Sequence, residues 1–454
     1  MKLCLKNIGK LDDVTVKLNG ITVIAGENNT GKSTVGKALY LYLHSLNNID
    51  NYVEDDIIET LKREMRQPMD SFDLLCRELS NAARRHKVAK ADEIRQKYAR
   101  EIYENDNTSQ LIRELAKEHA NLYGLNLDTI KEKNYNALES WEKEIESRIN
   151  AVLELDDDKI SARKVTSDIN QYFDGDIITI GKDNGMICVD YENGRSNQLH
   201  FLRDKKMGRD DCDDISRQEN VTVNPIYIES PKTIDQLHNL AKNKSKIYDV
   251  FKEILAPNML CKDVNEYDIE SYAAATITQQ EQNAALLKEF YSNVSDIVGG
   301  SLQFNAVNGL QFQERNNKRY IDISNLSNGI KSLILLEYAI EAGCLGKGDF
   351  LILDEPEINL HPEWQLEYAR MIIQLQNQLD LTVIMTTHTP YFLEAIEVFS
   401  QKYGVKERCS YYLAENNDNI VEISDVTDDI EQIYVKLARP FQILDRERES
   451  FEKI

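Results

Sequence analysis

The stretch Gly26-Glu-Asn-Asn-Thr-Gly31-Lys32-Ser33-Thr34 fits the pattern G-x-x-x-x-G-K-[ST] at every fixed position. It follows the β-branched run Ile21 to Ala25 and precedes apolar residues at helical spacing, which predicts a strand, a glycine-rich loop and a helix. The backbone N–H groups of such a loop surround a phosphate, and the helix N-terminus faces the same anion. The predicted ATP-binding residues are Gly26, Asn28, Asn29, Thr30, Gly31, Lys32, Ser33 and Thr34.

Two carboxylates follow the short apolar run Phe350 to Leu353. Such a run is typical of a strand buried in a parallel sheet, whose carboxyl edge also holds the phosphate loop. Lys32 is expected to contact the β- and γ-phosphates, while Ser33 and Asp354 hold Mg²⁺, Asp354 through the water shell of the ion. Glu355 is then placed to orient and deprotonate the attacking water. The alternative for both carboxylates is a plain polar strand end.

The stretch Thr382 to His388 repeats this design, with an apolar strand, two hydroxyl residues and a histidine at the strand end. Its order and spacing relative to Asp354 predict that His388 contacts the γ-phosphate and senses whether ATP is intact. The alternative is a histidine with a structural role only. For Glu357, a solvated carboxylate is the simpler interpretation.

Ser327 and Gly329 stand directly before a strongly apolar helix, in the stretch Asn325-Leu-Ser-Asn-Gly-Ile-Lys-Ser332. Ser327 can cap this helix. The free N–H groups of the same helix end can also form a second anion site, offered to the γ-phosphate of ATP held by another copy of the chain. The sequence leaves both interpretations open.

The composition is that of a globular protein, which we expect in the cytoplasm. The chain has 454 residues, of which 42% are hydrophobic and 29% charged. It contains no apolar run of the roughly 18 to 20 residues that would span a bilayer, and its charged start does not resemble a signal peptide. Seven scattered cysteines predict neither a disulfide framework nor a zinc site. A net charge of −23 opposes non-specific attraction to nucleic acid.

The motifs divide the chain into an ATPase head at residues 1–50 and 170–454 and a helical insertion at residues 51–169. A second helical segment is predicted within the head at residues 234–298. The first insertion is highly charged and poor in Pro and Gly, and either a helical subdomain or a coiled-coil arm would fit it. In the head, short apolar strands alternate with helices, which predicts an α/β fold with a doubly covered parallel sheet.

Further strands are predicted where β-branched or aromatic runs lie between turn residues. These runs are GDIITI at 175–180, GMICVDY at 185–191 and NPIYIE at 224–229. An Asn-Gly pair at 308–309 predicts a hairpin. The chain after His388 is expected to form a helix, two strands and a last helix, and to contain no further catalytic domain.

Taken in order, GENNTGKS, LSNGIKS, LILDEPEINLHPEWQ and TVIMTTH resemble the ATP-binding cassette-type heads of the structural-maintenance-of-chromosomes (SMC) superfamily. Within that group the sequence most resembles the OLD-like (overcoming lysogenisation defect) ATPases of bacterial anti-phage systems such as Septu and PARIS. The resemblance implies a P-loop head with a mixed, largely parallel sheet and a large helical insertion, with ATP and Mg²⁺ as ligands. The sequence departs from the family pattern in two places. The signature LSNGIK lacks the second glycine and the glutamine of transporter cassettes. The glutamine that usually follows the first insertion has no assigned position.

The same resemblance assigns roles to individual residues. It implies a signature made by Ser327, Asn328, Gly329 and Lys331, a dimer loop with Asn359 and His361, catalytic residues Glu355 and His388, and a metal site of Ser33 and Asp354.

The resemblance implies a slow ATPase that forms a head-to-tail dimer, or a higher homo-oligomer, around ATP. A separate nuclease or toxin would act as the effector, in anti-phage defence. Alternatives are a DNA-repair or chromosome-maintenance ATPase, the ATPase subunit of a transporter, and a module that holds ATP without turnover. Nucleic acid could bind the basic stretch of Arg84, Arg85, Lys87 and Lys90, which continues to Arg95 and Lys97, although one solvated helix face also explains it.

Overall fold

The computed structural model describes residues 1–80, 88–105, 107–204, 208–229, 297–305, 309–315, 317, 319–341, 344–417 and 420–452. The chain forms two compact units. The head unit consists of Met1–Asn47 and Val165–Ile454, and the helical unit of Asn48–Lys164. The helical unit overlaps the insertion predicted at 51–169. The second helical segment, predicted at 234–298, lies almost entirely outside the described residues.

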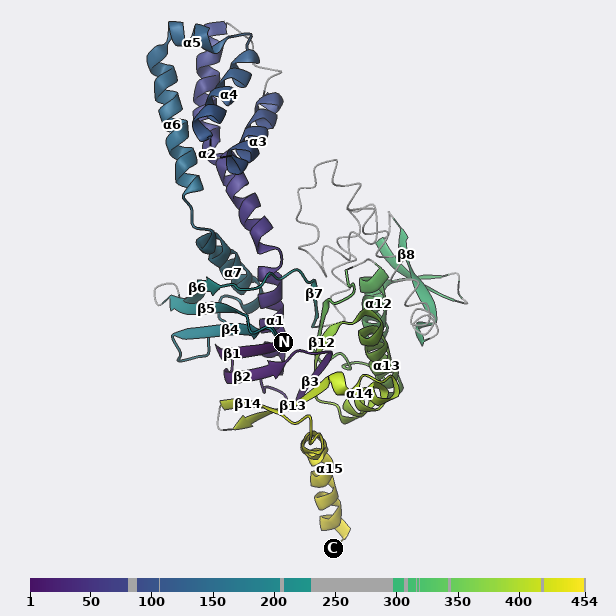
Figure 1. Cartoon of the computed structure of the whole chain (residues 1–454). Coiled ribbons are helices and arrows are strands. Elements are labelled where there is room, and N and C mark those ends of the chain that lie inside the picture. The colour runs from purple at the N-terminus through teal and green to yellow at the C-terminus, as the bar shows by residue number, and fades with distance from the viewer. Residues whose placement is uncertain are drawn as a thin grey trace. The chain divides into compact units, whose positions relative to one another are not determined.

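An eleven-stranded sheet forms the centre of the head unit, in the order β6-β5-β4-β1-β2-β14-β13-β3-β12-β11-β7 (Figure 1). Its strands are β1 (Lys2–Ile8), β2 (Leu11–Lys17), β3 (Ile21–Gly26), β4 (Asn184–Asp190), β5 (Ser196–Asp204), β6 (Arg209–Ser216), β7 (Pro225–Ile228), β11 (Phe350–Leu353), β12 (Thr382–Thr387), β13 (Cys409–Asn417) and β14 (Ile420–Asp425). A separate antiparallel sheet contains β8 (Gly300–Asn305), β9 (Gly309–Glu314) and β10 (Tyr320–Asp322).

The two halves of the large sheet differ in strand direction. Strands β13, β3, β12, β11 and β7 pair with one another in parallel, and β13 pairs antiparallel with β14 on its other side. Strands β6, β5, β4, β1 and β2 pair antiparallel. The predicted α/β class with a mixed sheet is therefore confirmed, and the parallel pairing lies in the half that carries the motifs.

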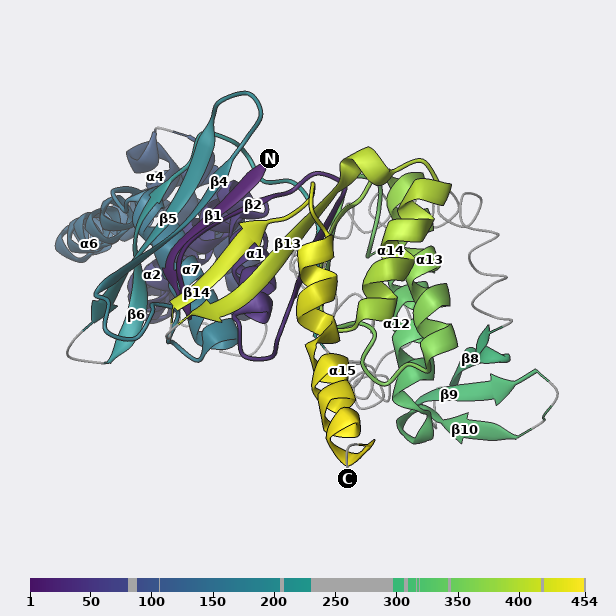
Figure 2. The same cartoon turned by 90° about the horizontal axis from the view of Figure 1, so that it is seen from below.

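Helices cover both faces of the parallel half. They are α1 (Lys32–Leu46), α12 (Asn328–Glu341), α13 (Pro362–Leu379) and α14 (Pro390–Lys402). Leu351 and Leu353 belong to one apolar core with α12, α13 and α14. Ile352 points to the other face, where a Cβ built on Gly36 of α1 would lie 3.1 Å from its Cγ2 atom. Figures 1 and 2 show α12, α13 and α14 side by side on one face and α1 on the other.

Several predicted elements agree with the structure and one does not. The predicted hairpin is formed by β8 and β9, whose connection at 306–308 lies outside the described residues. Strand β7 lies within its predicted run, and β4 begins one residue before its run. The last part of the chain forms β13, β14 and α15 (Glu431–Glu452), as expected. The prediction of a strand at 175–180 is wrong. Within this run, Ile178 forms an isolated bridge to Ile8, and no strand is formed.

The helical unit has its own apolar core. It contains α2 (Ile49–Ser80), α3 (Val88–Glu104), α4 (Thr108–Asn121), α5 (Leu127–Lys133), α6 (Tyr135–Leu153) and the start of α7 (Asp157–Phe173). Trp141 of α6 stacks on Phe72 of α2 at a centroid distance of 4.5 Å, and its Nε1 donates to the Pro68 carbonyl at 2.9 Å. Helices that share one core in this way form a helical subdomain. Among the described residues, no helix is both long and apolar enough to cross a bilayer.

Candidate active site

The phosphate loop lies between β3 and α1, and two of its glycines are required by geometry. A Cβ built on Gly26 would lie 2.2 Å from the Ala414 carbonyl oxygen of β13, so a larger residue would displace that strand. Gly31 has φ 70° and precedes the first residue of α1. This left-handed conformation favours glycine, which lacks a Cβ. The loop is thus shaped by the neighbouring strand and by its own backbone.

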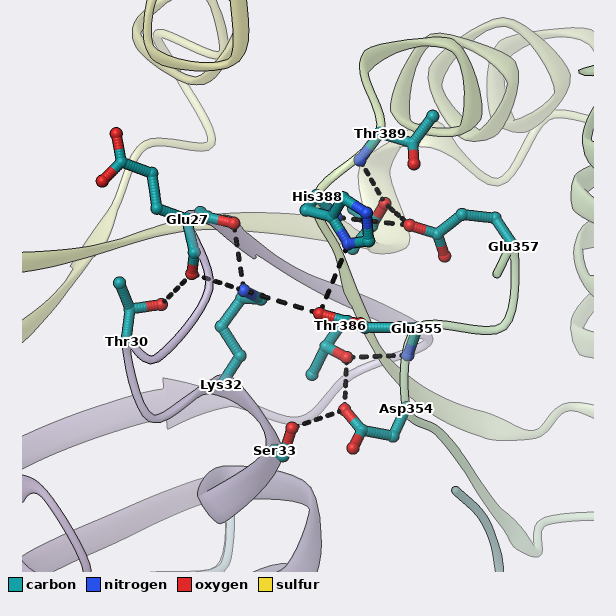
Figure 3. Close-up of polar contacts among 12 residues, drawn as sticks. Glu27, Thr30, Lys32, Ser33, Asp354, Glu355, Glu357, Thr386, His388 and Thr389 are labelled. Atoms are coloured by element: carbon teal, nitrogen blue, oxygen red, sulfur yellow. Dashed lines mark hydrogen bonds and ion pairs between the residues drawn. The ribbon is translucent and has the colours of Figure 1, made fainter. Parts of the chain in front are cut away.

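Lys32 is folded into the phosphate loop. Its Nζ donates to the carbonyl oxygens of Gly26 at 3.0 Å and Glu27 at 2.7 Å, and the residue is 4% exposed. Burial lowers the pKa of the Lys32 ammonium. Thr30 Oγ1 also donates to the Glu27 carbonyl, at 2.8 Å. The ammonium is therefore held where the loop would enclose a phosphate (Figure 3).

The remaining predicted loop residues lie on the outside of the loop or at the start of α1. Asn28 and Asn29 are exposed, and the Asn29 amide oxygen accepts from Lys10 Nζ. The Thr34 N–H donates to the Gly31 carbonyl at 3.1 Å. All eight predicted loop residues therefore belong to one turn between β3 and the first turn of α1.

Strand register brings the distant motifs to this loop. In the parallel pairs, Leu353 of β11 is the partner of Met385 of β12, and Thr387 of β12 is the partner of Ala25 of β3. Asp354 therefore emerges beside Thr386, and His388 emerges beside Gly26. The carboxyl edge of three adjacent strands collects the side chains, as expected for an open parallel sheet.

Asp354 accepts hydrogen bonds from three hydroxyls, one of which is Tyr227 Oη, which donates to Asp354 Oδ2 at 3.5 Å. Ser33 Oγ donates to Asp354 Oδ1 at 2.9 Å, and Thr386 Oγ1 donates to the same oxygen at 2.6 Å. The spacing of Ser33 Oγ and Asp354 Oδ1 is close to that of adjacent ligands of an octahedral ion with bonds of about 2.1 Å, so it would also fit direct binding of Mg²⁺ by Asp354, in place of the expected contact through the water shell. Mg²⁺ prefers oxygen ligands and usually keeps waters and substrate phosphates as well, so Ser33 and Asp354 fit this ion.

Glu355 lies between the Lys32 ammonium and the His388 ring, and it has an uncommon backbone conformation. Its φ is 47°, and its N–H donates to Thr386 Oγ1 at 2.9 Å. Its Oε1 lies 3.3 Å from His388 Nδ1 and 3.8 Å from Lys32 Nζ. The contact with His388 lowers the pKa of Glu355, and the same contact raises the pKa of His388. Left-handed residues other than glycine are often found where a functional side chain must be held in place.

Glu357 is buried, which corrects the expectation of a solvated carboxylate. It is 2% exposed, and its Oε1 accepts from Thr387 Oγ1 and, at 3.2 Å, from the His388 N–H. Its Oε2 is buried with no hydrogen-bond partner among the described residues. Burial raises the pKa of Glu357. Glu357 thus ties the loop after β11 to the loop that carries His388 (Figure 3).

The signature residues lie at the N-terminus of α12. Ser327 is exposed, and its Oγ accepts from the Ile330 N–H at 3.4 Å, so the capping geometry is present. Asn328 is half-buried. A Cβ built on Gly329 would lie 3.2 Å from the Asn359 carbonyl oxygen. Lys331 is 3% exposed and its Nζ donates to the Ser324 carbonyl at 3.1 Å, so this ammonium faces the interior of its own chain.

The predicted dimer loop precedes α13. Asn359 is exposed and has φ 69°, and His361 is exposed and caps α13 by accepting from the Glu363 N–H at 3.4 Å. The contact of this loop with Gly329 places the signature and the dimer loop side by side in one chain. The structure therefore collects the predicted residues in two groups, one around the phosphate loop and one around the start of α12.

The basic stretch is only partly described. Arg84, Arg85 and Lys87 lie outside the described residues, and Lys90 is exposed on α3. Arg95 does not belong to a solvated face, because it is 8% exposed and contacts Asp92. Lys97 Nζ pairs with Glu118 at 2.9 Å.

Comparison with known proteins gives one family match and several distant similarities. The model of the AAA ATPase domain family matches residues 1–393. An OLD nuclease from Thermus scotoductus is 26% identical over 155 residues, which is 34% of this chain and 29% of the nuclease. The chain thus aligns with less than a third of that relative.

Two SMC heads are among the similar solved structures. The SMC head bound to the C-winged helix domain of ScpA has a TM-score of 0.45 and 12% identity, with 95% of this chain and 98% of that chain covered. The SMC head domain from Thermotoga maritima has a TM-score of 0.35 and 10% identity, with 94% and 98% covered.

Proposed function

Because the chain belongs to the AAA ATPase family, we propose that it binds ATP with Mg²⁺ at the phosphate loop and hydrolyses it slowly. The observation that carries this proposal is the 2.9 Å contact between Ser33 and Asp354, two residues of separate motifs that fit one Mg²⁺. Bound Mg²⁺ would neutralise charge on the β- and γ-phosphates. Lys32 would contact the same phosphates from inside the loop, and the N–H groups at the start of α1 would bind them from the other side.

Glu355 is proposed as the general base and His388 as the γ-phosphate contact. In the structure Lys32 and the protonated form of His388 stabilise the charged form of Glu355, and a lowered pKa makes a carboxylate a weaker base. A bound γ-phosphate would attract both cations. Glu355 would then lose part of this stabilisation, its pKa would rise, and it would accept a proton from water more readily.

We further propose that two chains meet head to tail, with the signature of each placed on the ATP of the other. Ser327 is exposed at a helix N-terminus, and Asn359 and His361 are exposed beside that helix. This N-terminus has donors for an anion in addition to the capping contact of Ser327. Each chain would then supply half of each phosphate site.

A direct experiment tests hydrolysis and dimerisation together. Phosphate release is measured for the wild-type protein with ATP, in Mg²⁺ and in excess chelator, and sedimentation is measured for Glu355→Gln with ATP and with ADP. We expect Mg²⁺-dependent phosphate release by the wild type, and an ATP-dependent dimer of the Glu355→Gln protein. Absence of phosphate release contradicts the ATPase proposal, whereas a Glu355→Gln protein whose mass is the same with both nucleotides contradicts the dimer.

The proposed role of the ATPase is to control a separate effector, a nuclease or toxin, in anti-phage defence. The helical unit, Asn48–Lys164, supplies none of the residues assigned to the ATP site, so its surface is available to a partner. Phage challenge of cells that express the chain with its neighbouring genes tests this role. If the wild-type protein protects the cells and Lys32→Ala does not, the result supports this role. Equal protection by the wild type and Lys32→Ala contradicts it.

A further inference from the structure

A pocket of about 440 Å³ continues the phosphate site towards the C-terminal helix α15. On one side it is lined by residues 26–28 of the phosphate loop and by His388. On the other side it is lined by α15, including Lys436 and Arg439. We propose that Lys436 and Arg439 bind the γ-phosphate of an ATP held by the phosphate loop of the same chain.

Lys436 already contacts the loop. Its Nζ lies 2.9 Å from Glu415 Oε1 and 3.9 Å from Glu27 Oε1. Glu27 directly follows Gly26, so it belongs to the part of the loop that would surround the terminal phosphate. A carboxylate here repels a bound anion, and the nearby ammonium offsets this repulsion. A γ-phosphate would give Lys436 a more highly charged partner than either glutamate.

Arg439 is placed to complete the pair. It lies three residues after Lys436, so the two side chains emerge from the same side of α15. Arg439 is exposed, and it makes no ion pair or hydrogen bond with any residue that the structure describes. Two neighbouring cations on a chain with a net charge of −23 favour an anionic ligand at this pocket.

Helix α15 is held firmly at its start and has a missing hydrogen bond beside the pocket. Its start is anchored, since Ile433 is fully buried and Tyr434 Oη donates to Glu397 at 3.1 Å. Pro440 lies inside the helix and has no N–H to donate to the Lys436 carbonyl, so the helical hydrogen bonds are interrupted beside the pocket. Binding of the phosphate by Lys436 and Arg439 would therefore fix the turn of α15 that directly precedes Pro440.

This inference rests on the proposed ATP site and is tested by comparing ATP with ADP, which lacks the γ-phosphate. Titrations with fluorescent ATP and ADP analogues in Mg²⁺ are made for Lys436→Ala, Arg439→Ala and the double variant. The matched control is Arg448→Ala, an exposed arginine of the same helix whose ion pair with Asp445, at 3.1 Å, is away from the pocket. We expect about a tenfold loss of ATP affinity in the double variant, an unchanged ADP affinity, and no change in the control.

Three outcomes overturn the inference. They are an unchanged ATP affinity in the double variant, an equal loss for ATP and ADP, and an equal effect of Arg448→Ala. Arg439→Gln keeps the test valid if Lys436→Ala fails to fold, because Arg439 is exposed. The conservative Lys436→Arg variant should retain the preference for ATP. Failure of the wild type to bind ATP would instead contradict the proposed function itself.

Discussion

The Thr386 hydroxyl donates a hydrogen bond to Asp354 Oδ1 at 2.6 Å. Thr386 Oγ1 also accepts a hydrogen bond from the Glu355 N–H at 2.9 Å. A single side chain of β12 thus fixes both carboxylate-bearing residues that follow β11. This contact explains how Glu355 keeps a left-handed backbone conformation, with φ 47°.

Replacing Thr386 with Val should reduce turnover more than it reduces ATP binding. Valine has a similar shape but can neither donate to Asp354 nor accept from Glu355. Loss of such a supporting contact to a metal ligand typically costs about 10- to 100-fold in metal affinity or activity. We expect a kcat reduced by about this factor and a raised requirement for Mg²⁺, measured by phosphate release over a Mg²⁺ series. Thr382→Val, at the other end of the same strand, is the matched control and should behave as the wild type.

Lys32→Ala and Ser327→Arg should separate binding from hydrolysis. Lys32 contacts the ATP of its own chain, so its loss should weaken ATP binding by about 10- to 100-fold, the range expected for hydrogen bonds to a charged group. Ser327→Arg should leave ATP affinity within about threefold and remove hydrolysis, because the substitution blocks the partner's ATP site. Calorimetric titration and phosphate release measure the two effects. Equal loss of ATP affinity in both variants would mean that Ser327 is only a helix cap.

The pair of Glu355 and His388 should be visible in a pH titration. The raised pKa of His388 means that its stabilising effect is present below the ordinary histidine pKa of about 6.5 and is lost as the pH rises through the raised value. The lowered pKa of Glu355 means that its effect is lost as the pH falls through the lowered value, below about 4.3. The ion pair is therefore complete between about pH 4.3 and 6.5.

NMR measurement of the His388 ring carbons from about pH 4.3 to well above 6.5, so that the raised pKa of His388 is crossed, checks the pair. In Glu355→Gln the pKa of His388 should fall, because the neighbouring negative charge is gone. Glu363→Gln, which removes an exposed carboxylate elsewhere, should leave the pKa of His388 unchanged. An identical titration of His388 in wild type and Glu355→Gln would show that the carboxylate does not act on the ring.

Glu357 should stabilise the site as a hydrogen-bond acceptor, and its charge should oppose folding. Glu357→Ala removes the acceptor of the Thr387 hydroxyl and of the His388 N–H. Each buried donor left without an acceptor lowers the free energy of unfolding by about 1–3 kcal/mol. Glu357→Gln keeps the acceptor and removes the charge. Because burial raises the pKa of Glu357, the folded wild type loses stability as the pH rises through that raised value.

Thermal unfolding of these variants at several pH values tests this role. We expect Glu357→Ala to be destabilised throughout. Glu357→Gln should gain stability relative to the wild type as the pH rises from about 4.3 through the raised pKa of Glu357. Equal stability of Glu357→Ala and the wild type would contradict the role as an acceptor. A pH-independent difference between Glu357→Gln and the wild type would contradict the role of the charge.

The elements around the phosphate loop could be predicted because their signals are local. The strand Phe350–Leu353 has the bounds expected from its apolar run. Strand β6, by contrast, has the sequence RDDCDDIS, whose aspartates oppose strand formation in isolation. It forms because it pairs with β5, where Arg203 Nε donates to the fully buried Asp210 at 2.8 Å. The pairing of β6 with β5 depends on the folded sheet, so the sequence of β6 alone does not predict it.

The sequence also could not predict which individual polar residues are buried. Glu357 and Glu355 stand two residues apart after the same strand, and nothing in the local pattern distinguishes them. Thr387, the partner of Glu357, lies 30 residues further along the chain. Arg95 is similar, because its burial depends on how α3 packs in the helical unit. Spacing locates chemical groups on elements, whereas their exposure depends on packing between elements.

The position of β3 in the sheet has a consequence for biosynthesis. This strand carries the phosphate loop, yet both of its neighbours, β12 and β13, follow it by more than 350 residues of sequence. At the usual rate of translation the ribosome needs roughly 20 to 70 s to make the chain between them. During that interval the edges of β3 cannot be paired as in the finished sheet. A nascent chain therefore contains the complete phosphate-loop sequence long before it can form the ATP site, and β3 depends on protection by other contacts or by chaperones until β12 is made.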